Sequence, residues 1–424
     1  MNIHHHASNK NYSTNKSTII TTELISLFSA QMLFFIIPII AITTLDATNS
    51  QVGIINTFAG LGVLVFLALL SPLADTSRKD RILGLISLIR GIISATATYA
   101  LLTDSLNFFY LCILVFFISG LTALYDSAFS AALPEIIKKK ELSKINNWIA
   151  GLRAAADIGA GSLAGLSLAF GGAAVTLATI TVLYILSSLG SFSLKNLFDK
   201  ENTAPSETIS LNTVFLGFKI LYTNPVQLRL NLGIAHFNIF TTLIQTLYIA
   251  YMIRHAHMNE VQIGIASSIG GALGLAGVFI AAPLIEKLSF KTLMSTTLLV
   301  PGLAAFGIFL IPDFPPVTAT LALGVSLGFW IASTLINISA FETLKQLTIQ
   351  PRHIGKYTSA SRLLTWGLDP VGAALAAAAA LIMPLDLIML IGSIGIATSS
   401  LWIIASKQMT TISITITDTK NRRR

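Results

Sequence analysis

Long apolar stretches separated by short polar connections make up almost the whole chain of 424 residues. A helix needs roughly 20 mainly apolar residues to cross the hydrocarbon core of a bilayer. Stretches of about this length lie at 20–44, 51–74, 82–103, 107–133, 143–169, 172–194, 229–252, 261–285, 292–312, 315–341, 355–382 and 386–406. The pattern predicts an all-α membrane protein with twelve transmembrane helices.

Positive charges fall on one side of this arrangement when both termini are placed in the cytoplasm. Of the 27 Lys and Arg residues, only Arg254 falls in an outer connection, and Arg90, Arg153 and Arg362 fall within apolar stretches. Cytoplasmic loops of membrane proteins carry an excess of Lys and Arg. We therefore expect a multi-pass protein of the bacterial inner (plasma) membrane with both termini cytoplasmic.

The composition agrees with this class and excludes others. Charged residues make up 11% of the chain and hydrophobic residues 54%, which is unlike a soluble domain. The net charge of +8 follows from cytoplasmic loops that lie beside anionic lipid, so we expect membrane lipid as a partner and no nucleic acid. The single cysteine, Cys112, excludes a disulfide within the chain. No nucleotide-binding or metal-ligand motif occurs, so we expect no enzyme activity, cofactor or metal site.

The two halves of the chain repeat each other in register. Pro72-Leu73-Ala74-Asp75 follows the second stretch and Pro283-Leu284-Ile285-Glu286 follows the eighth, each with basic residues in the next turn. Six-helix halves that repeat in parallel are typical of secondary transporters. The predicted divisions are a polar N-terminal tail at 1–18, a six-helix bundle at 19–195, a cytoplasmic linker at 196–227, a second bundle at 228–406 and a basic C-terminal tail at 407–424.

Six ionisable side chains stand out away from the ends of the apolar stretches: Arg90, Asp126, Arg153, Asp157, Arg362 and Asp369. A charge at mid-bilayer costs at least about 2.5–3.5 kcal/mol, so each needs a partner or a wet cavity. The four-residue spacing of Arg153 and Asp157 predicts a local pair. Arg362 and Asp369 are seven residues apart, so Asp369 is the less compensated acid.

Asp369 is therefore the leading proton-coupling candidate, with Asp157 and Asp126 as the others. The first stretch has its acid, Glu23, only at the cytoplasmic end, so we expect no coupling carboxylate there. The alternative for Arg90, Asp126 and Arg153 is a structural pairing between helices.

Several motifs resemble those of the major facilitator superfamily. The stretch 71–79 (SerProLeuAlaAspThrSerArgLys) is similar to the signature between its second and third helices. The stretches 131–135, 217–221 and 369–372 resemble the branch that contains macrolide efflux pumps and enterobactin exporters. The resemblance implies the major facilitator fold, with two pseudo-symmetric six-helix bundles.

The resemblance also assigns roles to particular residues. Asp75, Arg78 and Lys79, with Glu286 in the second half, become a gate at the cytoplasmic face, and a solvated turn is the alternative. On the first, fourth, seventh and tenth helices, the candidates for the substrate cavity are Gln31, Phe35, Tyr125, His236, Asn238, Gln245, Trp330 and Asn337. Packed positions are the alternative for His236 and for the aromatic residues.

Glycines gather on two of the stretches. The eighth carries Gly270, Gly274 and Gly277, and the fifth carries Gly159 and Gly165. Small residues let helix backbones approach closely. Because the superfamily's fifth and eighth helices meet across the two halves, the resemblance implies a sliding interface there, and tight packing within one half is the alternative.

The resulting prediction is a monomeric secondary active transporter that works by alternating access. We expect this transporter to export a siderophore-like or drug-like small molecule in a proton-coupled reaction, with that substrate and protons as partners. The alternatives are an importer or facilitator of a small metabolite or siderophore, and a lysophospholipid transporter. A receptor or scaffold that does not transport is the more remote alternative.

Overall fold

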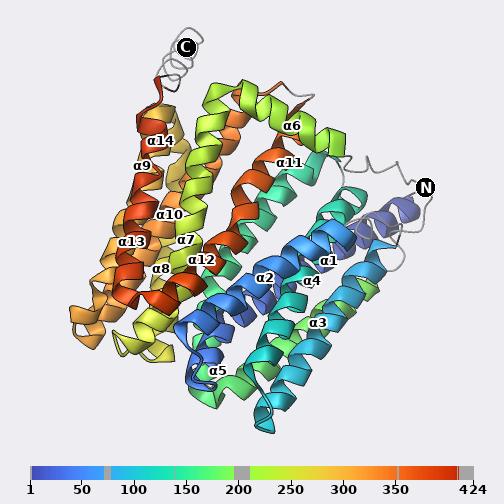
Figure 1. Ribbon diagram of the computed structural model, residues 1–424. Coiled ribbons are helices and arrows are strands. Elements are labelled where there is room, and N and C mark those ends of the chain that lie inside the picture. Colours follow the sequence, from blue (N-terminus) through green and yellow to red (C-terminus); the bar gives the residue numbers. More distant parts are fainter. Residues whose placement is uncertain are drawn as a thin grey trace. The chain divides into compact units, whose positions relative to one another are not determined.

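The computed structural model describes residues 2–70, 78–137, 139–194, 211–350, 353–407 and 409, and these are helical almost throughout. A backbone within lipid must satisfy its polar groups inside its own segment, which favours helices. In chain order (Figure 1) the helices are α1 (Asn2–Thr43), α2 (Asn49–Leu70), α3 (Lys79–Leu102), α4 (Phe108–Ile136), α5 (Lys139–Ser193), α6 (Leu211–Thr223), α7 (Pro225–Arg254), α8 (Glu260–Lys287), α9 (Phe290–Phe309), η2 (Ile311–Asp313), α10 (Pro316–Thr348), α11 (Ile354–Thr365), η4 (Trp366–Leu368), α12 (Asp369–Ile382), α13 (Leu385–Thr398) and α14 (Leu401–Ile404).

Within the described part of the chain, ten helices are long and apolar enough to cross a membrane. The number rises to eleven when Glu260–Gly277 and Phe279–Lys287, which meet at a 42° bend, count as one span. The predicted stretches at 143–169 and 172–194 join into the single element α5. This element breaks its helical geometry at Gly172, whose φ of 69° lies in the left-handed region that favours glycine.

The predicted tails and linker are only partly described. The polar tail expected at 1–18 is helical from Asn2, and the apolar part of α1 runs over Lys16–Thr43. Most of the linker expected at 196–227 lies outside the described residues, and its described part contains α6. The basic tail expected at 407–424 lies outside them as well, except for Lys407 and Met409.

The chain forms two compact units. The first comprises Met1–Ala47 and Phe58–Thr208, and the second comprises Thr48–Thr57 and Ile209–Arg424. Within the first unit α5 packs against α1 and α3, and α3 also packs against α4. A Cβ atom at Gly62 of α2 would lie 2.0 Å from the carbonyl oxygen of Phe116 of α4, so glycine is required for this approach. These close contacts fix the helices that carry the charged residues of the first unit.

In the second unit the glycines of α8 lie against α10. A Cβ at Gly270 would come within 2.6 Å of Leu327, and one at Gly277 within 2.6 Å of the backbone of Ala332. Gly328 of α10 in turn packs against Leu273 of α8. These glycines therefore serve tight packing within the second unit, which was the alternative, and a sliding interface between the halves stays a prediction. The physical reason is that α10 offers small residues of its own, so the two backbones can approach.

A polar cap fixes where α7 begins. Asn224 Oδ1 accepts hydrogen bonds from the backbone nitrogens of Val226 and Gln227, both at 3.2 Å, and Pro225 occupies the first turn of α7. A side-chain acceptor before a helix satisfies amides that have no partner inside it. Asn224 and Pro225 together set the register of α7, which carries much of the polar surface described below.

Candidate functional site

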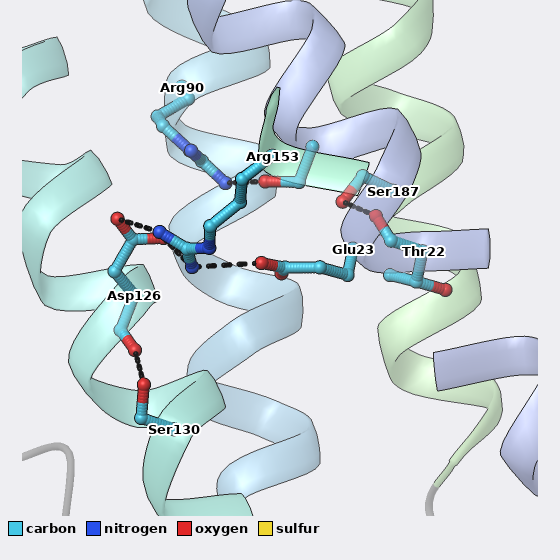
Figure 2. A network of polar contacts seen from close by, with 8 residues as sticks. Thr22, Glu23, Arg90, Asp126, Ser130, Arg153 and Ser187 are labelled. Carbon is cyan, nitrogen blue, oxygen red and sulfur yellow. Dashed lines mark hydrogen bonds and ion pairs between the residues drawn. The ribbon is translucent and has the colours of Figure 1, made fainter. Parts of the chain in front are cut away.

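Three helices of the first unit bring one arginine and two acids together (Figure 2). Arg153 of α5 donates to Asp126 of α4 through Nη1 at 3.2 Å and through Nη2 at 3.0 Å. Its Nη2 also donates to Glu23 Oε1 of α1 at 3.0 Å. An arginine that binds a carboxylate through two nitrogens makes a strong and directional contact. These three residues, here called the Arg153 cluster, tie α1, α4 and α5 together at one point.

Members of the Arg153 cluster differ in their access to solvent. The Glu23 side chain is 0% exposed, whereas those of Arg153 and Asp126 are 37% and 36% exposed. Glu23 Oε2 is buried and makes no hydrogen bond with the described residues. The cluster therefore combines a partly exposed ion pair, Arg153–Asp126, with a buried carboxylate, Glu23. Among the described residues, no group of three or more His, Cys, Asp or Glu side chains is placed to hold a metal ion.

Arg90 of α3 is fully buried close to this cluster. Its Nη2 donates to the hydroxyls of Ser26 at 2.9 Å and Ser87 at 3.2 Å, and its Nη1 donates to Thr122 at 3.4 Å. Hydroxyls accept from the two terminal nitrogens, whereas the buried Nε has no hydrogen-bond partner among the described residues, and the charge of the guanidinium remains. A buried cation without local compensation is costly, so the nearby acids of the Arg153 cluster are needed to balance it.

Two aromatic rings complete the surroundings of Arg90. Its Cζ lies 4.5 Å from the ring centroid of Tyr125 and 4.7 Å from that of Tyr184. Ring faces attract a cation at such distances. With both carboxylates ionised, Arg90 and the Arg153 cluster together carry zero net charge. Adding one proton to either acid would leave this apolar interior with a net positive charge.

The cluster differs from the sequence prediction in two respects. Arg153 was expected to pair with Asp157 one turn away, but its described ion pairs are with Asp126 and Glu23; the side chain of Asp157 lies outside the described residues. In addition, Glu23 of α1, which the sequence places at the cytoplasmic end of the first stretch, meets Arg153 directly. A signal was present in the sequence: Thr22, Glu23 and Ser26 follow one another at helical spacing, and all are buried.

Asp369 and Arg362, the ionisable residues of the eleventh predicted span, lie on either side of a break. Arg362 is in the last turn of α11, Asp369 is the first residue of α12, and η4 separates the two helices. Asp369 is half-buried, with the hydroxyl of Thr242 as its hydrogen-bond partner. No ion pair joins Asp369 to a residue of the described ranges. It is the acid within the spans with the least compensation in this part of the chain.

A cavity of about 400 Å³ lies inside the second unit, between α7, α9, α10 and α11. Of the predicted cavity residues, it brings together Asn238 and Asn337, and Arg362 also lines it. Asn337 donates to the hydroxyl of Thr297 at 2.8 Å, and Asn238 donates to the backbone oxygen of Thr365 at 3.2 Å. The volume falls in the range of small-molecule sites.

The structure places the other predicted cavity residues elsewhere in their units. His236 accepts a hydrogen bond from Trp402 Nε1 at 3.2 Å and stacks near Phe240, so it contacts the last helices of the second unit. Trp330 is buried, and Gln245 is exposed.

In the first unit, Tyr125 packs on Arg90 and is therefore part of the charged region described above. Gln31 and Phe35 are half-buried on α1.

The predicted cytoplasmic gate is described only in part. Asp75 lies outside the described residues. Arg78 forms an ion pair with Asp80 at 3.3 Å, and Lys79 is buried at the start of α3. Glu286 is exposed near the end of α8. The described residues thus give Arg78 a partner that the sequence analysis had not assigned.

A buried polar network in the second unit was missed altogether. Asn231 of α7 donates to the hydroxyl of Tyr357 of α11 at 2.7 Å and accepts a hydrogen bond from Ser361. Tyr357 donates to Gln227, which in turn donates to Thr348 at 2.7 Å. Gln227 and Asn231 lie four positions apart on α7, and this spacing could have revealed a polar helix face in the sequence. The network joins α7 to α10 and α11, the helices that also line the cavity.

Comparisons with known proteins agree with this fold. The family model of the Major Facilitator Superfamily matches residues 19–368. No curated protein matches the chain.

Several solved structures are similar. They include a bacterial homologue of the iron transporter ferroportin in an inward-facing state (TM-score 0.72, 15% identity, covering 92% of this chain and 98% of that one). The nucleoside transporter NupG (0.68, 13%, 92% and 98%) and a bacterial homologue of the human lysosomal transporter Spinster (0.67, 14%, 95% and 96%) are others.

At such low identity the solved structures show the fold alone, and the predicted macrolide and enterobactin branch stays a prediction. The family model covers most of the chain, and the family is one of transporters rather than enzymes. The apolar helices make the protein a multi-pass membrane protein. The chain belongs to the Major Facilitator Superfamily.

Proposed function

We propose that this chain is a secondary active transporter that works by alternating access and couples substrate movement to protons. The observation that carries the proposal is Asp369, a carboxylate within an apolar span that has a hydroxyl and no described cation beside it. Ionisable residues at such positions are expensive and mark substrate or proton pathways. A carboxylate without a fixed counter-ion can change its charge without stranding a buried cation, which suits a proton carrier.

The Arg153 cluster takes a second role in this proposal. Asp126 is held by two hydrogen bonds to Arg153, so it serves mainly to tie helices together. Glu23 has one free oxygen and a single described ion pair, which makes it the second proton-coupling candidate. Asp157 stays a candidate from the sequence alone.

The proposal includes twelve spans, both termini in the cytoplasm and a place in the bacterial inner membrane. The break of α5 at Gly172 supports two spans within that element, and the bent pair in α8 supports one more. The charge asymmetry of the connections supports the orientation. Labelling of cysteines introduced at 134–141 should occur only from the cytoplasmic side, and labelling from outside would refute this topology.

For substrate and direction we propose export of an amphipathic, siderophore-like or drug-like molecule by a monomer. The support is the resemblance of three stretches to exporter motifs, together with a cavity that carries both apolar and polar residues. The similar solved structures include an iron transporter homologue, a nucleoside transporter and a lysosomal transporter homologue, so the fold itself accommodates varied cargo.

Counterflow in proteoliposomes tests the function. Vesicles loaded with an unlabelled member of a panel of siderophores, drugs, lysophospholipids and metabolites should transiently accumulate the same labelled compound. A transporter shows this exchange for at least one member, and a scaffold shows none. Net uptake that does not respond to a pH gradient would identify a facilitator and refute proton coupling.

A further inference from the structure

The cavity of the second unit has a distinct distribution of charge. Three charged side chains line it: Glu342, Lys345 and Arg362. Lys345 Nζ lies 2.5 Å from Glu342 Oε2, and the lysine side chain is only 7% exposed, so these two charges compensate each other. No described carboxylate forms an ion pair with Arg362. The lining therefore carries one uncompensated positive charge.

Arg362 is held in a way that leaves it available to a ligand. Its guanidinium carbon lies 5.1 Å from the ring centroid of Trp366, one turn further along the chain, and both side chains are exposed. A guanidinium on an aromatic ring keeps its nitrogens free at the edge, where they match the oxygens of a carboxylate, phosphate or sulfonate. A cation in an apolar span needs a counter-charge or water, and a bound anion supplies the counter-charge.

The rest of the lining is suited to an apolar body. Phe237, Leu298, Ile338 and Phe341 contribute large apolar side chains to the same cavity, and Asn337 and Thr297 add a neutral hydrogen-bonding pair. Small-molecule sites commonly combine an apolar lining with a few placed polar groups. The volume of about 400 Å³ admits a molecule of two or more fused or linked rings.

We propose that this cavity is a binding site for amphipathic molecules with a single anionic group, in which Arg362 binds the anion and Trp366 stacks on the adjacent ring. The inference rests on the proposed transport function and adds the substrate class. Arg362 sets the charge preference by attracting the anion, and Glu342 limits this preference by neutralising Lys345. Trp366 contributes to affinity irrespective of ligand charge.

Binding of a matched pair of probes tests the proposal without requiring transport. Naphthalene-2-sulfonate carries a fixed negative charge, and naphthalene-2-sulfonamide has nearly the same shape and is neutral. Isothermal titration calorimetry on the full-length protein in nanodiscs should show about tenfold or tighter binding of the sulfonate, the ratio expected for one charge-assisted hydrogen-bonded contact. In Arg362→Gln the ratio should fall to about one.

Variants with opposite expected effects keep the test decisive. Glu342→Gln should tighten sulfonate binding and leave the sulfonamide unchanged. Trp366→Leu should weaken both probes by a similar factor and keep their ratio, and it tests the site even where Arg362→Gln fails to fold. Lys287→Gln, which removes one positive charge at the exposed end of α8, is the matched control and should bind as the wild type does.

Equal binding of the two probes by the wild type would overturn the proposal, as would an unchanged ratio in a folded Arg362→Gln protein. A sulfonate affinity that Glu342→Gln leaves unchanged or lowers would also overturn it. Failure of the transport function gives a different result: the charge preference persists, but no compound of the counterflow panel is exchanged.

Discussion

Replacement of Arg153 by methionine removes the cation that joins α1, α4 and α5 while keeping most of the apolar stem. Glu23 is then left as a fully buried acid without its described ion pair, since its side chain is 0% exposed. Breaking a buried ion pair by removing one partner costs about 3–5 kcal/mol. Asp126 is 36% exposed, so it depends less than the buried Glu23 on the charge of Arg153. That contact should contribute about 1 kcal/mol or less.

Double-mutant cycles separate the two contacts. The cycle of Arg153→Met with Glu23→Gln should give a coupling of about 3 kcal/mol, and the cycle of Arg153→Met with Asp126→Asn should give about 1 kcal/mol. For a unit of this size the larger coupling corresponds to about 6–12 °C in the unfolding midpoint. Asn and Gln keep the shapes of the acids, so the cycles report mainly on charge.

Cys112 provides the assay. It is the only cysteine of the chain, it is buried on α4, and it becomes reactive when the first unit unfolds. Thermal unfolding followed with a thiol-reactive fluorogenic maleimide therefore reports on the unit that contains the cluster. Equal couplings, or a larger coupling with Asp126 than with Glu23, would refute the reasoning that burial decides the energy of these pairs.

Three further results are expected. Gly277→Val should destabilise the second unit by about 1–3 kcal/mol, because its Cβ would meet the backbone of α10, whereas Gly367→Ala, with open space around it, should cost less in the same thermal assay. Tyr357→Phe should cost about 1–3 kcal/mol by removing the hydroxyl that donates to the buried side chain of Gln227 and accepts from Asn231, and an unchanged unfolding midpoint would argue against this network. Asp75→Asn should slow transport more than it weakens substrate binding, since the sequence places it at the cytoplasmic end of the second span, and equal losses of both would argue against a gate.

Helix positions could be predicted from the sequence because each depends on a local property. A run of apolar residues long enough to cross a bilayer can be recognised without knowing what it packs against. The cap formed by Asn224 and Pro225 is equally local. Contacts between helices depend on which faces meet. The glycines of α8 are visible in the sequence, but only the structure shows that Gly328 of α10 lies opposite them.

Of the two partners of Arg153, Asp126 belonged to the structural pairing that the sequence analysis had offered, whereas Glu23 was missed for the same reason. The four-residue rule favoured Asp157, which is close in sequence, whereas its partners in the structure are 27 and 130 residues away. The packing of helices brings residues that are distant in sequence into contact, and no local sequence pattern shows which of them will meet. Glu23 lies near the start of the apolar run, and the sequence alone does not show that helix packing brings it to Arg153.

Proton movement driven by substrate tests the central claim most directly. Proteoliposomes that contain a pH-sensitive dye would be supplied with a compound that the counterflow panel has identified, first with wild-type protein and then with Asp369→Asn. Wild-type protein should change the internal pH as substrate crosses, and Asp369→Asn should exchange substrate for substrate while leaving the internal pH constant. Full proton-coupled transport by a well-expressed Asp369→Asn protein, or substrate movement without any pH change in the wild type, would contradict the account.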